Sequence, residues 1–137
     1  MKICLSEIIN KFCDYNLAYF NGMLPRPKFE LMDSFKYFGY FECEPGNGYI
    51  DNPVIKISKN YEYTSEQLKN ILVHEMLHYY LAYTGEDTKL RHGKAFKTEA
   101  NRLNEQYRLN ITEKINMNEY TRCKDTSAIK YFFAKLF

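Results

Sequence analysis

One segment of the chain, residues 64–83, predicts a helix that is apolar on almost every side. Thr64 and Gln67 have the spacing of a capping box at its start, and Gly85 can end it. The apolar side chains spread around most of the helical wheel are Leu68, Ile71, Leu72, Val73, Met76, Leu77 and Leu81. A helix with this distribution is buried over most of its surface, so the rest of the chain must pack around it.

The remaining sequence supplies the elements that could cover this helix. Helical spacing predicts further helices over residues 5–20 and 93–107, and β-favouring residues predict strands within residues 28–58. The tail from residue 127 predicts an amphipathic helix, with one apolar stripe made by Ile129, Phe132, Phe133, Leu136 and Phe137. We therefore expect an α+β fold. A small antiparallel or mixed sheet would pack against an N-terminal helix and the central helix, followed by C-terminal helices.

Length and composition narrow the class of protein. At 137 residues the chain has the size of one domain, and its 45% hydrophobic and 26% charged residues are typical of a globular protein. It contains no apolar run near the ~20 residues that a membrane span needs. Glu7, Lys11 and Asp14 interrupt the first twenty residues, which is unlike a signal peptide. We therefore expect a cytoplasmic protein without a membrane partner.

The predicted central helix carries the sequence His74-Glu75-Met76-Leu77-His78. Residues four apart on a helix lie one above the other, about 6 Å apart along its axis. Two imidazoles placed in this way can bind one Zn²⁺ at about 2.0–2.1 Å. Glu75 directly follows the first ligand, where it can take a proton from a water that the metal activates. His74 and His78 are therefore predicted metal ligands, and Glu75 is the predicted catalytic base.

His92 is the predicted third ligand. The chain has three histidines, and all lie between residues 74 and 92. A turn at Gly85 and a helix from Gly93 would bring His92 back toward the other two. Two buried histidines beside a glutamate would be costly without a metal, and three imidazoles with one open position are typical of catalytic zinc. We therefore expect one Zn²⁺ per chain.

Glu99 is an alternative third ligand. It follows the motif by twenty-one residues, close to the spacing of zincins that use a downstream glutamate. Those proteins have an aspartate four residues later, where this chain has Leu103. The metzincin pattern is excluded because Leu81 and Thr84 stand at the positions of its glycine and third histidine. We therefore prefer His92 as the ligand.

Most of residues 10–110 resembles the SprT-like (Spartan-type) metalloprotease domain. The segments that carry the resemblance are Tyr19–Pro25, Gly39, Ile55–Ser58, His74–His78 and His92–Lys97. The resemblance implies a zincin-like fold in which His74, His78 and His92 bind zinc and Glu75 is the general base.

The resemblance also implies a division of the chain. Residues 1–115 would form the SprT-like domain, and residues 116–137 an extension whose amphipathic helix docks on it. Many members of the family carry a C-terminal zinc ribbon with paired cysteines. Here Cys123 stands where such a ribbon would begin, but Thr126 replaces its second cysteine and no later cysteine exists. The chain therefore looks like a short form without an intact ribbon.

Charge is unequally distributed between the two parts of the chain. Residues 1–88 carry 8 basic and 12 acidic side chains, whereas residues 89–137 carry 11 basic and 5 acidic ones, a net charge of +6. This excess permits a surface that faces a polyanion. Known members of the family cleave proteins crosslinked to DNA, so we expect a protein substrate and DNA as a partner of the basic C-terminal part.

Two functions of different classes fit these patterns. The first is a zinc endopeptidase, in which Val54–Ser58 or a neighbouring strand pairs with an extended substrate. The second is a non-proteolytic, zinc-stabilised adaptor whose C-terminal helix binds a partner. Glu75 favours the endopeptidase, because a purely structural zinc site needs no general base.

Overall fold

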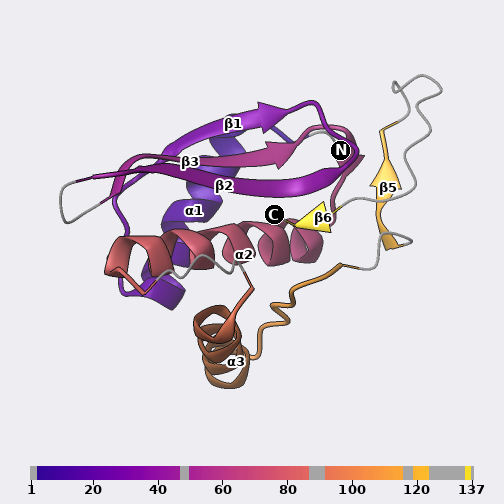
Figure 1. Ribbon diagram of the computed structural model, residues 1–137. Coiled ribbons are helices and arrows are strands. Elements are labelled where there is room, and N and C mark those ends of the chain that lie inside the picture. The colour runs from indigo at the N-terminus through magenta and orange to yellow at the C-terminus, as the bar shows by residue number, and fades with distance from the viewer. Residues whose placement is uncertain (1–2, 47–49, 87–91, 116–118, 124–134, 137) are drawn as a thin grey trace.

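The main sheet is mixed and has the strand order β1-β3-β2-β6. The computed structural model describes residues 3–46, 50–86, 92–115, 119–123 and 135–136. Within them the strands of this sheet are β1 (Lys28–Met32), β2 (Tyr37–Pro45), β3 (Ile50–Ser58) and β6 (Lys135–Leu136). β1 runs parallel to β3, and β2 runs antiparallel to β3, so β3 is an inner strand (Figure 1).

The described residues form three helices: α1 (Leu5–Phe20), α2 (Ser65–Thr84) and α3 (Lys94–Tyr107). α2 contacts β2 and β3 on one side, and it also contacts α1 and α3. Figure 1 shows α2 running alongside the three long strands, with α3 on the side of α2 away from the sheet. This arrangement makes α2 the centre of the fold, as its all-round apolar sequence predicts.

The ends of α2 have the local structures that the sequence predicts. The Thr64 hydroxyl accepts a hydrogen bond from the Gln67 backbone N–H at 3.1 Å, and the Thr64 N–H donates to Gln67 Oε1 at 3.0 Å. This reciprocal pair is a complete capping box. At the other end, Gly85 adopts the left-handed conformation with φ of 77°. Eleven residues of α2 are buried between these ends, among them His74, Glu75 and His78.

The predicted α+β class is confirmed, and so is the mixed sheet packed against the N-terminal and central helices. The structure begins α1 at Leu5 and ends it at Phe20, as predicted. It begins α3 at Lys94, with Gly93 as the residue that precedes the first turn. None of the helices in the described residues combines the length and the apolarity needed to cross a membrane.

The predicted C-terminal helix is wrong at Lys135 and Leu136. These two residues form β6, which pairs in parallel with β2. A short helix has few backbone hydrogen bonds of its own, so pairing with an open sheet edge can outweigh helical periodicity. The rest of the predicted apolar stripe, residues 129–133 and Phe137, lies outside the described residues.

The proposed pairing of a substrate with Val54–Ser58 is also wrong. This segment belongs to β3, whose two edges are occupied by β1 and β2. An inner strand has no free backbone groups to offer a peptide. The neighbouring strand β2 pairs with β3 on one edge and with β6 on the other, and it packs against α2.

A second, two-stranded sheet joins a segment just before α2 to a segment after α3. It pairs β4 (Tyr61–Glu62) antiparallel with β5 (Thr121–Arg122). The Cys123 backbone N–H also donates to the Asn60 carbonyl at 2.9 Å. The division into a domain of residues 1–115 and an extension of residues 116–137 stays a prediction.

Candidate metal centre

The three histidines of the chain meet at one place. His74 and His78 lie on consecutive turns of α2, and His92 directly precedes Gly93 at the start of α3. Their Nε2 atoms are 3.1 Å apart between His74 and His92, 3.2 Å between His74 and His78, and 3.3 Å between His78 and His92. The helical hairpin therefore brings together the three residues that the sequence predicts as ligands.

The spacing of the three Nε2 atoms fits a bound zinc ion. Nitrogen ligands of a tetrahedral zinc at about 2.0–2.1 Å would lie roughly 3.3 Å from one another. The observed separations of 3.1–3.3 Å are close to this value. His74 and His78 are buried and His92 is half-buried, so a metal here would be held inside the protein with one side open. Imidazole ligands suit zinc, and also copper, iron and nickel.

His74 is held in the tautomer that metal binding requires. Its Nδ1 lies 2.8 Å from the backbone oxygen of Thr112. Because a carbonyl oxygen can only accept a hydrogen bond, Nδ1 carries the proton and donates it. The lone pair of the neutral ring then lies on Nε2, which faces the other two histidines. An outer hydrogen bond of this kind fixes the orientation of a ligand imidazole.

Phe96 packs against all three imidazoles. Its ring centroid lies 4.8 Å from that of His74, 4.7 Å from that of His78 and 4.9 Å from that of His92. Phe96 is 2% exposed and lies in the first turn of α3. One apolar side chain therefore restricts the rotation of every predicted ligand and excludes water from one side of the cluster.

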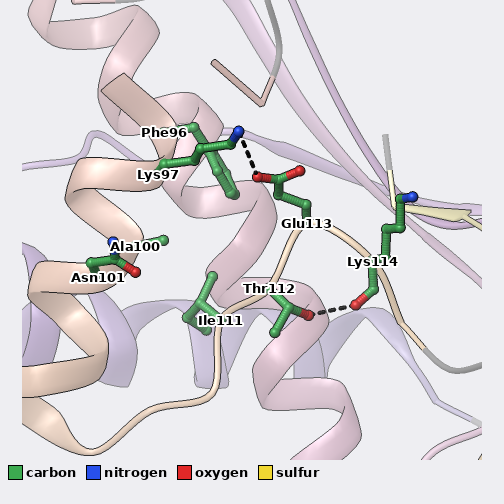
Figure 2. Close-up of a pocket in the computed structure, with 8 residues that line it drawn as sticks. All are labelled: Phe96, Lys97, Ala100, Asn101, Ile111, Thr112, Glu113 and Lys114. Carbon is green, nitrogen blue, oxygen red and sulfur yellow. Dashed lines mark hydrogen bonds and ion pairs between the residues drawn. The ribbon is translucent and has the colours of Figure 1, made fainter. Parts of the chain in front are cut away.

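A surface cavity of about 480 Å³ lies beside the cluster, between α3 and the segment that follows it. Figure 2 shows Phe96 and Thr112 in its lining, the two residues that also contact the histidines. At its rim, Lys97 Nζ forms an ion pair with Glu113 Oε1 at 3.5 Å. The cavity therefore lies next to two of the residues that hold the histidine side chains in place.

Glu75 is fully buried and points from α2 toward strand β2. A Cβ added to Gly39 would lie 2.9 Å from Glu75 Oε2 and 3.0 Å from Glu75 Cγ. The glycine at this position is what allows strand and helix to approach so closely. The predicted base therefore points from the helix of the predicted ligands toward strand β2.

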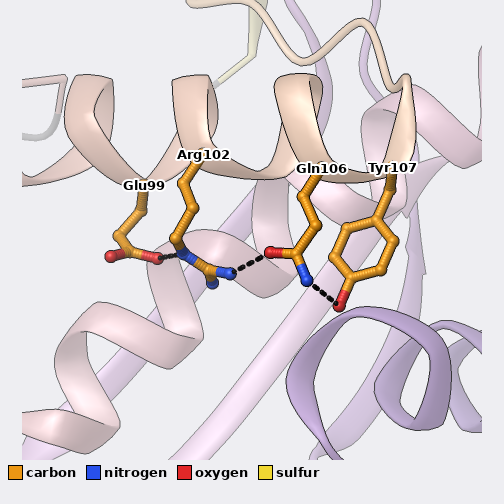
Figure 3. A network of polar contacts seen from close by, with 4 residues as sticks. All are labelled: Glu99, Arg102, Gln106 and Tyr107. Atoms are coloured by element: carbon orange, nitrogen blue, oxygen red, sulfur yellow. Dashed lines mark hydrogen bonds and ion pairs between the residues drawn. The ribbon is translucent and has the colours of Figure 1, made fainter.

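The alternative ligand, Glu99, is engaged elsewhere. Its Oε2 accepts a hydrogen bond from Arg102 Nε at 2.9 Å. Arg102 donates in turn to Gln106, whose amide donates to the Tyr107 hydroxyl. Figure 3 shows this row of contacts along one side of α3. The group of described residues able to hold a metal comprises the three histidines and not Glu99.

The tyrosines that follow the motif have packing roles. The Tyr79 hydroxyl donates to the Pro25 carbonyl at 2.7 Å, and its ring stacks on Phe41. Burial raises the pKa of Tyr79 to about 12. Tyr80 packs against Phe20, and Tyr83 is exposed. None of these contacts places a phenol beside the metal ligands.

The chain belongs to the SprT-like family, which residues 8–116 match. This match covers the three histidines, Glu75, Gly39 and the whole of the structure from α1 to α3 except its first three residues. Membership in this family indicates a metalloprotease-type function. No curated protein matches the chain.

Sequence reasoning missed two of the residues that build the centre. Phe96 lies in the segment His92–Lys97 that resembles the family, but nothing in the sequence places its ring against the histidines. Thr112 contributes only its backbone oxygen, an atom that every residue has. A main-chain contact of this kind leaves no signal in a single sequence.

Proposed function

We propose that the protein is a zinc-dependent endopeptidase with a zincin-like active site. The observation that carries this proposal is the convergence of three histidine Nε2 atoms, 3.1–3.3 Å apart, on the helix that also presents buried Glu75. When bound, zinc would supply Lewis-acid polarisation of the scissile carbonyl and of the attacking water. His74, His78 and His92 would hold it.

Glu75 would act as the general base and then as the general acid. Its carboxylate would accept a proton from the attacking water and donate it to the amine that leaves. Its complete burial between α2 and β2 excludes bulk water from this proton transfer. The Thr112 carbonyl would keep His74 protonated on Nδ1 throughout, so that Nε2 remains a ligand.

The substrate would be an extended peptide that lies along β2. β2 runs from Tyr37 to Pro45, and Gly39 near its start lies against Glu75. An open strand edge binds a peptide backbone by β-augmentation, with little dependence on side-chain identity. Because Gly39 lies against Glu75, a peptide on this edge would pass next to the proposed base.

The experiment that tests this function compares the wild type with Glu75→Gln. We expect about one zinc per chain in both proteins, and cleavage of a quenched-fluorescent peptide library by the wild type alone. Full activity of Glu75→Gln would remove Glu75 as the base. Zinc binding with no hydrolysis by the wild type of any peptide or protein would favour the adaptor, and absence of zinc after reconstitution would exclude the enzyme.

DNA as a partner, and DNA-associated proteins as substrates, also belong to this proposal and rest on the charge of residues 89–137 and the family. Two of the described cations in this part, Lys97 and Arg102, form ion pairs with Glu113 and Glu99. Binding through the remaining cations should fall steeply as salt concentration rises. Absence of binding to single- and double-stranded DNA at low salt would exclude this part of the proposal.

A further inference from the structure

The carbonyl that orients His74 belongs to a segment without regular secondary structure. Thr112, whose backbone oxygen lies 2.8 Å from His74 Nδ1, stands in residues 108–115, which form neither helix nor strand. No helical or sheet ladder therefore fixes the direction in which this carbonyl points. Because His74 depends on that direction, the contacts that hold the segment also bear on the candidate metal centre.

Asn104, near the end of α3, binds the residue that precedes Thr112. Its Nδ2 donates to the Ile111 carbonyl at 3.0 Å, and its Oδ1 accepts from the Ile111 backbone N–H at 2.8 Å. We call this pair of hydrogen bonds the Asn104 clasp. It uses both backbone groups of Ile111, so it ties the peptide units on either side of that residue to α3. The second of these units leads directly into Thr112.

Packing alone does not hold the segment against α3 near Thr112. A cavity of about 480 Å³ lies between the helix and residues 111–114, and Figure 2 shows its two sides facing one another. At the rim, the ion pair of Lys97 and Glu113 also joins the two sides, but these side chains are 60% and 38% exposed. Exposed ion pairs contribute little to stability. Of these two polar links, the half-buried Asn104 clasp is the stronger one.

We propose that Asn104 is a positioning residue of the metal centre, which acts on His74 through the backbone of Ile111 and Thr112. This inference rests on the proposed function, because it assumes that His74 is a metal ligand. The clasp keeps the Thr112 carbonyl where it accepts the Nδ1 proton, and this leaves the lone pair on Nε2. Without the clasp the carbonyl loses its fixed position, and a fraction of the His74 rings carries the proton on Nε2 instead.

The chain contains a second clasp of the same design, at the end of α1. Asn16 Nδ2 donates to the Leu24 carbonyl at 2.9 Å, and Asn16 Oδ1 accepts from the Leu24 backbone N–H at 3.1 Å. Asn16 is 9% exposed, so this clasp is more buried than the one made by Asn104. It holds the turn after α1 rather than the segment that contains Thr112. Its loss should therefore lower stability without changing the orientation of His74.

Paired substitutions at the two clasps separate positioning from stability. Leucine has the branched shape of asparagine but neither donates nor accepts a hydrogen bond. Asn104→Leu and Asn16→Leu therefore each remove the partner of two backbone groups, and both should lower the melting temperature. Asn104→Ala and Asn16→Ala, which leave room for water at each clasp, replace this pair if leucine prevents folding.

The first readout is zinc affinity, measured by competition with a chromogenic chelator. We expect it to fall about 10- to 100-fold in Asn104→Leu, as for the loss of an outer hydrogen bond to a ligand, and to stay within about twofold of the wild type in Asn16→Leu. Equal affinity in the two variants would overturn the proposal, because the Asn104 clasp would then act on stability alone.

The second readout uses metal-free protein and separates this proposal from the proposed function. At about pH 8, long-range ¹H–¹⁵N correlation of the histidine rings should show His74 protonated on Nδ1 in the wild type and in Asn16→Leu, and a mixture of both tautomers in Asn104→Leu. A wild type that bound no zinc would end the proposed function, whereas this comparison would still decide the role of the clasp. A His74 ring protonated on Nδ1 alone in Asn104→Leu would overturn the inference.

Discussion

Gly39 and Glu75 lie so close that the strand residue has no room for a side chain: a Cβ at position 39 would come within 2.9 Å of Glu75 Oε2. The same Cβ would also meet Ile71 Cγ2 at 2.9 Å. This contact sets the separation between β2 and α2 at the level of the proposed base. It therefore couples the position of strand β2 to the position of the proposed catalytic carboxylate.

Gly39→Ala should lower activity without loss of the metal. The added methyl group must displace the Glu75 side chain and the Cγ2 of buried, β-branched Ile71, so the variant should also lose about 1–3 kcal/mol of stability. A displacement of the base by a fraction of an ångström should lower kcat/KM about 10- to 100-fold. Zinc content and peptide hydrolysis, measured on the same preparation, check this expectation.

Gly85→Ala provides the control for Gly39→Ala. Gly85 has a φ of 77° and nothing within 4 Å of an added Cβ, so alanine there strains the backbone without a steric contact. It should cost about 1 kcal/mol of stability and leave kcat/KM nearly unchanged. Equal losses of activity in the two variants would show that the effect at Gly39 is one of general stability.

His92→Ala and Glu99→Gln test which residue is the third ligand. His92→Ala removes one of three converging Nε2 atoms and should lower zinc affinity by several orders of magnitude. Glu99→Gln removes only an ion pair with Arg102 on the side of α3, so its zinc affinity should equal that of the wild type. Competition with a chromogenic chelator measures both. Full zinc affinity in His92→Ala would reverse the assignment.

Thr64→Ala should destabilise the protein by about 1 kcal/mol, because it removes the hydroxyl that accepts the Gln67 N–H at the start of α2. Thr64→Ser keeps this acceptor and should lose much less. Urea unfolding monitored by circular dichroism compares the two variants. A similar loss in both would mean that the methyl group, rather than the cap, stabilises this end of the helix.

The buried phenol of Tyr79 predicts a loss of stability in alkali. Its pKa is raised to about 12 in the folded protein, from about 10 in the unfolded chain, by burial. The unfolded chain therefore ionises first as pH rises. The stabilisation is complete below pH 10 and is lost between about pH 10 and 12. Tyr79→Phe should have a lower melting temperature at pH 8, since Pro25 loses its donor, but a shallower decline above pH 10.

The parts of this protein that the sequence predicts well are those decided by local pattern. The capping box at Thr64, the glycine end at Gly85 and the four-residue spacing of His74 and His78 each depend on neighbours in the chain. The family resemblance also drew attention to Gly39. It did not explain why a glycine is needed there, which is the close contact with Glu75.

The features that the sequence could not predict depend on contacts between segments that lie far apart in the chain. The order of the strands makes β3 an inner strand, although nothing in Val54–Ser58 distinguishes it from an edge. Leu136 fits a helical stripe in the sequence, but pairing with β2 decides its conformation. The packing of Phe96 on the three imidazoles likewise requires the hairpin to have closed.

The contact between His74 and the Thr112 carbonyl has a consequence for how this centre would appear in a mutational scan. The acceptor is a main-chain atom, so any of the other residues placed at position 112 would still present it. Position 112 would therefore tolerate substitution even though the orientation of His74 depends on its backbone oxygen. Its importance would become visible only when the path of the backbone changes, for example through a deletion between Leu109 and Thr112. Tolerance to substitution would thus conceal a contact on which the orientation of His74, a predicted metal ligand, depends.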